Sequence, residues 1–524
     1  MNSKKKLLSI TNLKKYFPIA KTSIFQKEEY FVKANEDISI DIYEGETIGL
    51  VGESGCGKST FGRTLLQLYP QTAGTTMYYG KDIHDVAPEY VKDTLKNFDK
   101  HYKEYARLLK EFENLQEQVD KAGGLDKADF FLAQNYNLAE ANLQTSFSKT
   151  VKIVGGFFVE DAKADRKEAF GLMLKKLLND KKIADYKSDI NDCKTKIDVL
   201  DSEHKNVAKL NKKIDSNNTN IEKLSKTNEE IETNLAAIRN KYKDNEKFNE
   251  YEKLSDNGID LSRLNYSEMR KLRNDLQIIF QDPYSSLNPR MTVGQIIEEG
   301  LITHNYYKPG SEAMKEYVFQ TMEKCGLQDY MVYRYPHQFS GGQRQRICIA
   351  RALAVKPKFV VCDECVSALD VSIQSQIINL LEELKEKDKL TYLFISHDLS
   401  VVKYISDKIG VMYLGNLVEF ADKETLFKDP RHPYTVALLS SIPTTDLDSR
   451  DKDKIILEGN IPSPIKPPEG CKFHTRCFMA CDKCKHVTPK LTEIEPGHFV
   501  ACHFAEKKLD ENGNYLFEYK KKTN

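Results

Sequence analysis

The chain has no excess of positive or negative charge. Its 524 residues include 78 Lys and Arg and 78 Asp and Glu, so the formal net charge at pH 7 is +0. No net field therefore indicates a nucleic-acid partner or an acidic surface. Long apolar runs are also missing, because no stretch approaches the ~18 residues of a membrane-spanning helix and the N-terminus lacks the apolar core of a secretion signal. We expect an intracellular protein that is not itself a membrane pore.

A disulfide framework is missing as well. Most of the cysteines are scattered along the chain, at Cys56, Cys193, Cys325, Cys348, Cys362 and Cys365. This distribution is not typical of disulfide-rich secreted domains. At ~150 residues per domain, the length predicts two or three structural units.

A phosphate-binding loop is the most informative feature that is present. It fits the pattern G-x-x-x-x-G-K-[ST] and consists of Gly52, Glu53, Ser54, Gly55, Cys56, Gly57, Lys58 and Ser59. The apolar run 47–51 predicts a buried strand before it, and 60–66 predicts a helix whose N-terminus points at the anion. The glycines let backbone N–H groups surround the phosphates, Lys58 adds a positive charge, and the Ser59 hydroxyl can bind Mg²⁺.

Four further motifs follow in order along the chain. They are Ser340-Gly341-Gly342-Gln343, then Asp363-Glu364 after the apolar run 359–362, then Ser367-Ala368-Leu369-Asp370, then His397 after the strand-like run 392–396. Asp363 would lie at the carboxyl end of a buried strand, where it can hold the Mg²⁺ shell. Glu364 can accept a proton from an attacking water, and His397 can contact the γ-phosphate. Each motif alone also fits a turn, a surface pair or a core histidine, but their order favours catalysis.

These motifs together resemble the ATP-binding subunits of ABC transporters. The resemblance implies an α/β P-loop ATPase that works as a head-to-tail pair, in which the signature loop of one subunit caps the ATP bound to the other. The implied ATP-binding residues are Tyr16, Gly52, Glu53, Ser54, Gly55, Cys56, Gly57, Lys58, Ser59, Thr60, Ser340, Gly341, Gly342, Gln343 and Asp370.

The same resemblance assigns the catalytic roles. Glu364 would be the general base, His397 the switch histidine and Gln281 the Q-loop residue, and the implied Mg²⁺ ligands are Ser59, Gln281 and Asp363. Phe17 is an alternative to Tyr16 as the ring that stacks on adenine. Cys365 stands where the family usually has proline, and this loosens a backbone constraint beside the base. Because Glu364 is present, we expect hydrolysis.

The residues that exceed the length of one nucleotide-binding domain lie in a Lys- and Asn-rich segment, residues 85–261. Apolar residues recur three and four apart in two stretches, at Val91, Leu95, Phe98, Tyr102, Tyr105, Leu109, Phe112 and Val119, and at Leu200, Val207, Leu210, Ile214, Ile221, Leu224, Ile231, Leu235, Ile238 and Tyr242. Gly123 and Gly124 end the first. Asn217 and Asn228 interrupt the second, as polar residues do where they fix register.

We expect the two stretches to form one antiparallel coiled-coil arm. At ~1.5 Å per residue they span roughly 40 and 60 Å, so part of the second must pack on something else, such as the connector. A flexible charged spacer is the alternative.

Two other classes of ATPase are less compatible with this sequence. The DNA-associated SMC and Rad50 ATPases also carry coiled-coil insertions, but their insertion follows the Q-loop, whereas the insertion in this chain precedes Gln281. Tandem ABC proteins of the ribosome need two phosphate loops, and this chain has one.

The C-terminal third resembles the ATPases of oligopeptide and dipeptide permeases. The matching segments are Asp429-Pro430-Arg431-His432-Pro433-Tyr434-Thr435, Gly459-Asn460-Ile461-Pro462-Ser463-Pro464 and Gly470-Cys471-Lys472-Phe473-His474-Thr475-Arg476-Cys477. Within the ATPase core, the segment Asn288-Pro289-Arg290-Met291-Thr292 resembles the F-type subunit of these permeases more than the D-type subunit. We expect ATPase segments at 1–84 and 262–430, separated by the insertion, and a C-terminal extension at 431–524.

This resemblance implies an importer of oligopeptides, with dipeptides or another small substrate such as nickel as alternatives. The implied partners are a sister ATPase of the D-type, two transmembrane permease subunits and an extracytoplasmic peptide-binding protein. The protein would lie peripherally on the cytoplasmic face of the cell membrane and bind no nucleic acid.

The extension also predicts a metal centre. Cys471, Cys477, Cys484 and Cys502 repeat the spacing of the permease family, and Cys481 is an added thiol. Four thiolates suit a [4Fe–4S] cluster or tetrahedral zinc, and the resemblance favours iron–sulfur. Reduced cysteines without a ligand are the alternative.

Overall fold

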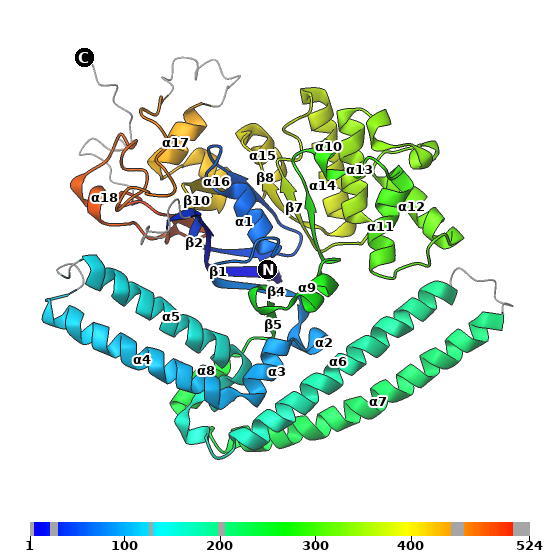
Figure 1. Ribbon diagram of the computed structural model, residues 1–524, viewed down its shortest axis with the longest axis horizontal. Coiled ribbons are helices and arrows are strands. Elements are labelled where there is room, and N and C mark those ends of the chain that lie inside the picture. Colours follow the sequence, from blue (N-terminus) through cyan, green and yellow to red (C-terminus); the bar gives the residue numbers. More distant parts are fainter. Residues whose placement is uncertain are drawn as a thin grey trace. The chain divides into compact units, whose positions relative to one another are not determined.

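The computed structural model describes residues 5–20, 30–124, 128, 130–197, 205–441 and 455–506. The chain divides into two compact units, Met1–Thr76 with Arg270–Asn524, and Met77–Met269 (Figure 1). The predicted insertion, 85–261, lies within the second unit. Across the described residues, no helix combines the length and the apolar character needed to span a bilayer.

An eight-stranded sheet is the centre of the first unit, in the order β11-β12-β10-β9-β3-β8-β7-β6. Its strands are β3 (Thr47–Val51), β6 (Leu276–Ile279), β7 (Phe359–Asp363), β8 (Thr391–Ile395), β9 (Lys408–Tyr413), β10 (Asn416–Asp422), β11 (Thr492–Glu495) and β12 (His498–Val500). From β6 to β9 neighbouring strands are parallel. Every residue of β3, β7 and β8 is buried, as expected for strands covered on both faces.

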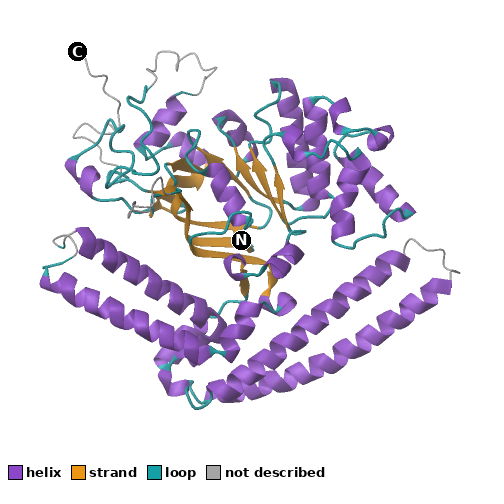
Figure 2. Cartoon of the chain, viewed as in Figure 1, coloured by secondary structure: helices purple, strands orange, loops and turns teal. Residues whose placement is uncertain are grey.

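Helices pack around this sheet (Figure 2). The α-helices are α1 (Lys58–Leu65), α10 (Pro283–Ser286), α11 (Val293–Thr303), α12 (Glu312–Lys324), α13 (Gly341–Leu353), α14 (Val371–Asp388), α15 (Leu399–Ile405), α16 (Lys423–Lys428), α17 (Pro433–Ser440) and α18 (Asp482–His486). Short 3₁₀ turns occupy Asp329–Tyr333 and Pro336–Gln338. The parallel α/β architecture places the carboxyl ends of β3, β6, β7 and β8 at one edge of the sheet.

A smaller sheet has the strand order β2-β1-β4-β5. β1 (Lys6–Pro18) pairs antiparallel with β2 (Phe31–Tyr43). β4 (Ala73–Asp82) continues into the second unit, where it pairs with β5 (Gly258–Asp260). In that pairing Asp82 lies opposite Gly258, so the chain leaves this sheet and returns to it at neighbouring positions.

The second unit contains two helical hairpins, and the prediction of one coiled-coil arm is wrong in its pairing. α4 (Phe98–Lys121) packs on α5 (Phe130–Val154), and α6 (Arg166–Ile197) packs on α7 (Lys205–Asn240) (Figure 1). The connector is itself helical, so each predicted stretch has a partner next to it in sequence. Closing a short loop costs less entropy than closing a long one, which favours these local pairings.

The remaining elements of this unit are short. They are α2 (Ile83–Val86), α3 (Glu89–Lys96), α8 (Glu246–Lys253), α9 (Tyr266–Leu272, which continues into the first unit) and the 3₁₀ turns Gly155–Phe158, Glu160–Ala162 and Leu261–Arg263. The first predicted stretch breaks at Asn97, between α3 and α4. Gly123 and Gly124 have φ of 86° and 109° and follow the end of α4, as predicted. Leu200 lies outside the described residues.

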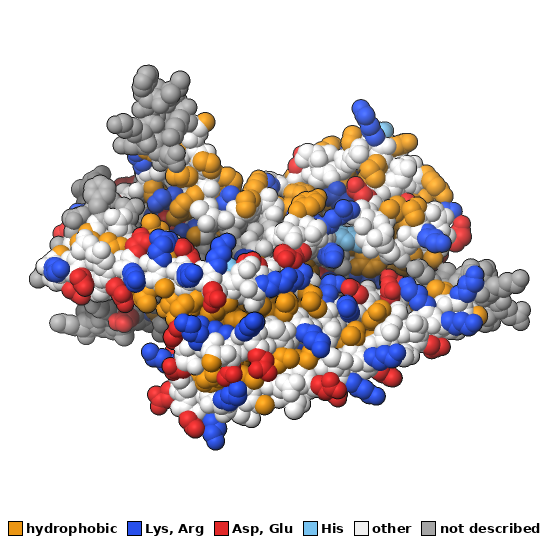
Figure 3. All heavy atoms as spheres, turned by 60° about the horizontal axis from the view of Figure 1, so that its bottom comes forward, with side chains coloured by type: hydrophobic (Ala, Val, Ile, Leu, Met, Phe, Trp, Pro, Cys, Tyr) orange, Lys and Arg blue, Asp and Glu red, His pale blue; other side chains and the backbone are white. Residues whose placement is uncertain are grey.

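Asn228 joins α6 and α7 through polar contacts inside their seam. Its side chain is 7 % exposed. The Asn179 amide donates to its oxygen at 2.9 Å, and its own amide donates to Asp180 at 2.6 Å. These bonds form only in one register, in line with the predicted role of Asn228. In the space-filling view, exposed hydrophobic side chains gather in stripes between charged side chains of both signs (Figure 3).

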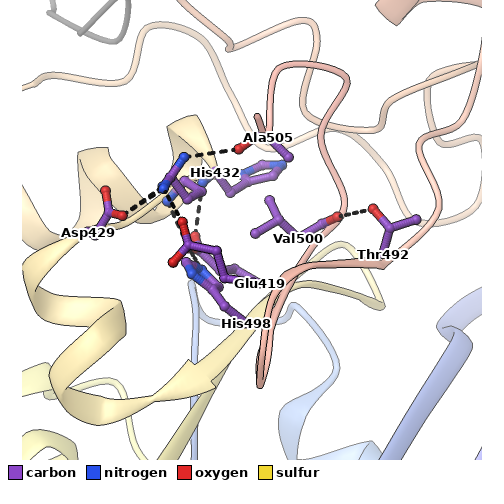
Figure 4. Close-up of polar contacts among 9 residues, drawn as sticks. Glu419, Asp429, His432, Thr492, His498, Val500 and Ala505 are labelled. Carbon is purple, nitrogen blue, oxygen red and sulfur yellow. Dashed lines mark hydrogen bonds and ion pairs between the residues drawn. The ribbon is translucent and has the colours of Figure 1, made fainter. Parts of the chain in front are cut away.

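A buried carboxylate ties the extension to the large sheet (Figure 4). Glu419 of β10 is 0 % exposed and accepts hydrogen bonds from the backbone N–H groups of Arg431 and His432, at 2.8 and 3.0 Å. His498 of β12 lies 2.8 Å from the same carboxylate. Burial lowers the pKa of His432 to about 4, so its imidazole is neutral at pH 7. Glu419 thus gives the Arg-His-Pro-Tyr segment of the sequence a structural role.

Candidate active site

The phosphate loop connects β3 to α1, as predicted. Gly52, Gly55 and Gly57 have positive φ of 148°, 79° and 101°. A Cβ at Gly57 would lie 2.1 Å from the Ala34 carbonyl oxygen, and one at Gly52 would lie 2.3 Å from the Met412 oxygen. The loop therefore has its shape because neighbouring backbone approaches it where only glycine fits.

Lys58 projects back into this loop. Its side chain is buried, and its ammonium donates to the carbonyl oxygens of Gly52 at 2.8 Å and Glu53 at 3.1 Å. The Cys56 sulfur lies 3.7 Å away. These three contacts are with uncharged groups, so a phosphate can supply the countercharge that favours a buried ammonium.

Asp363 ends β7 with one unsatisfied carboxylate oxygen. The residue is 1 % exposed, and Oδ2 accepts a hydrogen bond from Arg63 of α1 at 3.1 Å. Within the part of the chain that the structure describes, Oδ1 is buried without a hydrogen-bond partner. Buried polar atoms normally have a partner, and an orphaned carboxylate oxygen suits Mg²⁺ or one of its waters. Arg63 was not recognised from the sequence, because nothing marks one helical arginine as the partner of a distant carboxylate.

Gln281, Glu364 and His397 come together beside Asp363. The Gln281 amide donates to Glu364 Oε2 at 2.7 Å, and His397 Nδ1 lies 3.7 Å from the same oxygen. These residues follow β6, β7 and β8, whose carboxyl ends share one edge. Glu364 has a φ of 49°, an uncommon conformation for a residue other than glycine, and its N–H donates to the Ile395 oxygen at 3.0 Å. Such backbone strain is often found at functional sites.

Cys365 fills the position of the missing proline. It is 2 % exposed and hydrogen-bonds to Cys362 of β7, which with burial raises the pKa of the Cys362 thiol well above its usual value. Cys365 therefore packs into the core beneath the base.

The signature residues begin α13. The Ser340 hydroxyl accepts from the Gln343 N–H at 3.4 Å, and the Gln343 side chain accepts from the Ser340 N–H at 3.1 Å. A Cβ at Gly342 would lie 2.4 Å from the Ile373 side chain. Ser340 and Asp370 are exposed, each directly before a helix. Their exposure leaves them accessible to another subunit.

The two candidate adenine rings have different surroundings. The Tyr16 hydroxyl donates to Glu36 at 2.7 Å, and burial, with the Glu36 charge, raises the pKa of Tyr16. Phe17 packs edge-to-face on Tyr69 at 5.4 Å between ring centroids. Tyr16 and Phe17 both remain candidates for stacking on adenine.

The cysteines of the extension lie near one another. The Cys471 N–H donates to the Cys484 oxygen at 2.8 Å, and the Cys481 and Cys484 sulfurs are 3.6 Å apart. Burial, together with the neighbouring thiols, raises the pKa of Cys477 and of Cys502 to about 12. Among the described residues, no three or more His, Cys, Asp or Glu side chains are grouped so that they could hold a metal ion.

Comparison with known protein families agrees with this geometry. The ABC transporter family model matches residues 35–258 and 233–367. The chain belongs to the ABC transporter family. A second model, the C-terminal region of oligopeptide/dipeptide transporters, matches residues 418–484 of this ABC protein. The predicted family and its α/β P-loop ATPase fold are confirmed.

Curated relatives of this ABC protein carry transport names. It is 54 % identical over 247 residues to the putative oligopeptide transport ATP-binding protein YkfD of Bacillus subtilis, across 47 % of this chain and 75 % of the relative. It is 53 % identical over 248 residues to AppF of Bacillus subtilis, with the same coverage of each chain. It is 49 % identical over 246 residues to OppF of Haemophilus influenzae, across 47 % and 74 %. AppF and OppF are both named oligopeptide transport ATP-binding proteins.

Proposed function

We propose that this ABC protein is the ATP-hydrolysing subunit of an importer that takes up oligopeptides. The observation that carries the proposal is the convergence of Gln281 and His397 on Glu364, the residue that follows Asp363. Among the described residues, Asp363 Oδ1 is buried without a hydrogen-bond partner. The names of its relatives and the match of its C-terminal region support the peptide substrate. Dipeptides are the second candidate, because the C-terminal family covers both substrate classes.

The mechanism follows from these side chains. Lys58 and the loop N–H groups bind the phosphates of ATP, and Ser59, Gln281 and Asp363 would hold Mg²⁺, which neutralises charge on the phosphates when bound. Gln281 donates to Glu364 and so orients it. Glu364 takes the proton of the attacking water, and His397 steadies the γ-phosphate. Chemistry of this kind depends mainly on positioning and electrostatics.

The exposed residues at the starts of α13 and α14 have a separate role. We infer that Ser340, Gly341, Gly342 and Asp370 complete the ATP site of a sister ATPase, as the family's head-to-tail pair requires. Two membrane subunits and an extracytoplasmic peptide-binding protein would form the rest of the importer. The protein would lie on the cytoplasmic face of the membrane.

Peptide-stimulated ATPase activity tests this function. The complex is purified with the products of the neighbouring genes, reconstituted in membranes, and given peptides of two to eight residues. Stimulation by peptides of four residues or more supports oligopeptide import. Stimulation by dipeptides alone would support the second candidate. An assembled complex that hydrolyses ATP but responds to no peptide would contradict both.

Removal of the hairpins should leave ATP binding intact. Asp82 and Gly258 lie opposite each other in the β4–β5 pair, so a short Gly/Ser turn can replace residues 83–257. No proposed site residue lies in this segment. We expect an affinity for ATP within ~2-fold of the parent, measured with a fluorescent nucleotide, since the site loses no contact.

The same deletion carrying Lys58→Ala is its control, because it should lose the binding signal. A folded trimmed protein that no longer binds ATP would show that the hairpins support the catalytic core. The insertion would then be part of the ATPase and not an accessory.

A metal centre in the extension is a further prediction. We propose that Cys471, Cys477, Cys484 and Cys502 hold a [4Fe–4S] cluster or zinc, since four thiols are a complete ligand set for either. The described structure does not group these side chains around one point, so the proposal requires them to come together when the metal binds. Anaerobically purified protein should contain iron and sulfide, or one zinc per chain, by elemental analysis. Binding would deprotonate the thiols, so protons should be released on loading.

Cys481→Ser is the matched control and should retain the metal, whereas Cys477→Ser should lose it. A folded, metal-free preparation that takes up neither iron nor zinc under anaerobic reconstitution would contradict the proposed metal centre.

A further inference from the structure

Glu53, the second residue of the phosphate loop, has each of its polar groups engaged. Its carboxylate accepts two hydrogen bonds from Arg476, at 2.7 Å from Nη1 to Oε2 and 3.0 Å from Nη2 to Oε1. Its N–H donates to the Tyr434 hydroxyl at 2.9 Å. Its carbonyl oxygen accepts from Lys58 at 3.1 Å. The first three bonds join Glu53 to residues of the C-terminal extension, Arg476 and Tyr434.

The pair between Arg476 and Glu53 is bidentate and mostly shielded from water. The Arg476 side chain is 7 % exposed and that of Glu53 is 25 % exposed. The hydrogen bonds that Arg476 donates to Glu53 raise the pKa of Arg476 above its usual value. A bidentate guanidinium–carboxylate pair fixes orientation as well as distance, so Glu53 has little freedom to turn while Arg476 holds it.

Packing holds Arg476 and Tyr434 in place. The Tyr413, Tyr434 and Phe473 rings form a cluster with centroid distances of 4.8, 5.1 and 5.3 Å. Tyr434 and Phe473 are 0 % and 1 % exposed. Phe473 belongs to the same short segment as Arg476, so the aromatic core beneath the loop fixes both contacts to Glu53.

A second contact holds this segment near the other end of the phosphate loop. Lys472 donates to Glu36 at 2.8 Å and to the Leu414 oxygen at 2.9 Å. Burial favours the neutral acid, but Lys472 and the other partners of Glu36 outweigh it and lower its pKa to about 2. Asn35, next to Glu36, donates to the Gly57 oxygen at 3.1 Å. The segment therefore supports the loop at Glu53 directly and at Gly57 through β2.

We propose that Arg476 and Tyr434 are positioning residues for ATP, through which the C-terminal extension sets the affinity of the phosphate loop. The inference rests on the proposed function, in which ATP binds this loop. By holding Glu53 they keep the loop in one backbone conformation before the nucleotide arrives. A loop that must become ordered on binding gives weaker affinity. Losing this support should raise the dissociation constant and KM for ATP and leave kcat nearly unchanged. The bound substrate and the transition state contact the same ordered loop, so the cost of ordering it affects both equally.

Two variants test this in the full-length protein. Arg476→Gln keeps a polar side chain and removes the charged fork, and we expect the dissociation constant for MgATP to rise ~5- to 30-fold, with kcat of the assembled complex within ~2-fold at saturating ATP. Tyr434→Phe keeps the aromatic cluster and removes only the hydroxyl, and we expect a smaller rise of ~2- to 10-fold. Fluorescence of an ATP analogue and competition by MgATP give the affinities. If Arg476→Gln does not fold, Tyr434→Phe decides.

Arg431→Gln is the matched control. Arg431 is a buried arginine of the same extension, 3 % exposed, which pairs with Asp429 and Glu495 and not with the loop. It should lower the melting temperature and leave the affinity of the folded protein unchanged. The exchange Glu53→Arg with Arg476→Glu should recover part of the affinity that either single change removes.

The outcomes separate this inference from the proposed function. Parental affinity in both Arg476→Gln and Tyr434→Phe would overturn the inference and leave the function intact. Equal weakening by Arg431→Gln would also overturn it, since general destabilisation would then explain the effect. A parent protein that binds no ATP would overturn the proposed function itself, and the inference with it.

Discussion

Glu364→Gln is expected to lower the ATPase rate of the assembled transporter by ~10²- to 10⁴-fold, the usual contribution of a general base. The amide keeps the size of the carboxylate but cannot take a proton from water. Affinity for ATP should change by less than ~3-fold, because glutamine retains an oxygen for the hydrogen bond that Gln281 donates at 2.7 Å. Steady-state hydrolysis and equilibrium nucleotide binding are measured on the same preparation.

The control for this variant is Glu386→Gln, which makes the same chemical change on the exposed surface of α14 and should hydrolyse ATP at the parental rate. If Glu364→Gln in the assembled complex also hydrolyses ATP at that rate, Glu364 is not the base. His397, 3.7 Å from its carboxylate, would then be the next residue to test.

Lys58→Ala is expected to weaken ATP binding by ~10- to 100-fold, the loss of one charged hydrogen-bonding group, and to abolish measurable hydrolysis. The ammonium is buried in the loop, and its hydrogen bonds within the described part of the chain are all to uncharged groups. Its removal therefore deletes positive charge where the phosphates bind. Calorimetry or a fluorescent nucleotide gives the affinity.

Lys387→Ala, a change at an exposed lysine of α14, serves as the control and should bind ATP like the parent. The melting temperature of Lys58→Ala must stay close to that of the parent for the comparison to hold. Unchanged ATP affinity in a folded Lys58→Ala protein would mean that the loop does not hold the nucleotide phosphates.

The insertion shows where helical periodicity stops being informative. The apolar repeats predicted helices over 91–119 and 200–242. Helices are found at Glu89–Lys96, Phe98–Lys121 and Lys205–Asn240, so Tyr242 lies beyond the end of the last one. The second repeat also marked Asn228 as a buried polar residue, which it is. The partner of each helix could not be predicted, because the apolar face of one helix can pack on the apolar face of any other helix of similar width. The helical connector then supplied nearer partners.

The catalytic cluster shows a similar division. The sequence identified Glu364 and His397 after strand-like runs, and the family resemblance identified Gln281. That the amide of Gln281 reaches the carboxylate of Glu364 depends on the strand order β3-β8-β7-β6 and on the backbone turn at Glu364. Neither can be obtained from residue spacing.

The sequence by itself determined the family, the phosphate loop and the residue types that can bind and hydrolyse ATP, because those features lie in short contiguous segments whose backbone geometry and chemistry are local. Only the tertiary structure decided which distant groups complete them. Arg63 meets Asp363 across 300 residues, and Arg476 meets Glu53 across 423. Such contacts are set by how strands and helices pack in three dimensions, and an arginine that will hold a loop looks, in the sequence, like any other arginine.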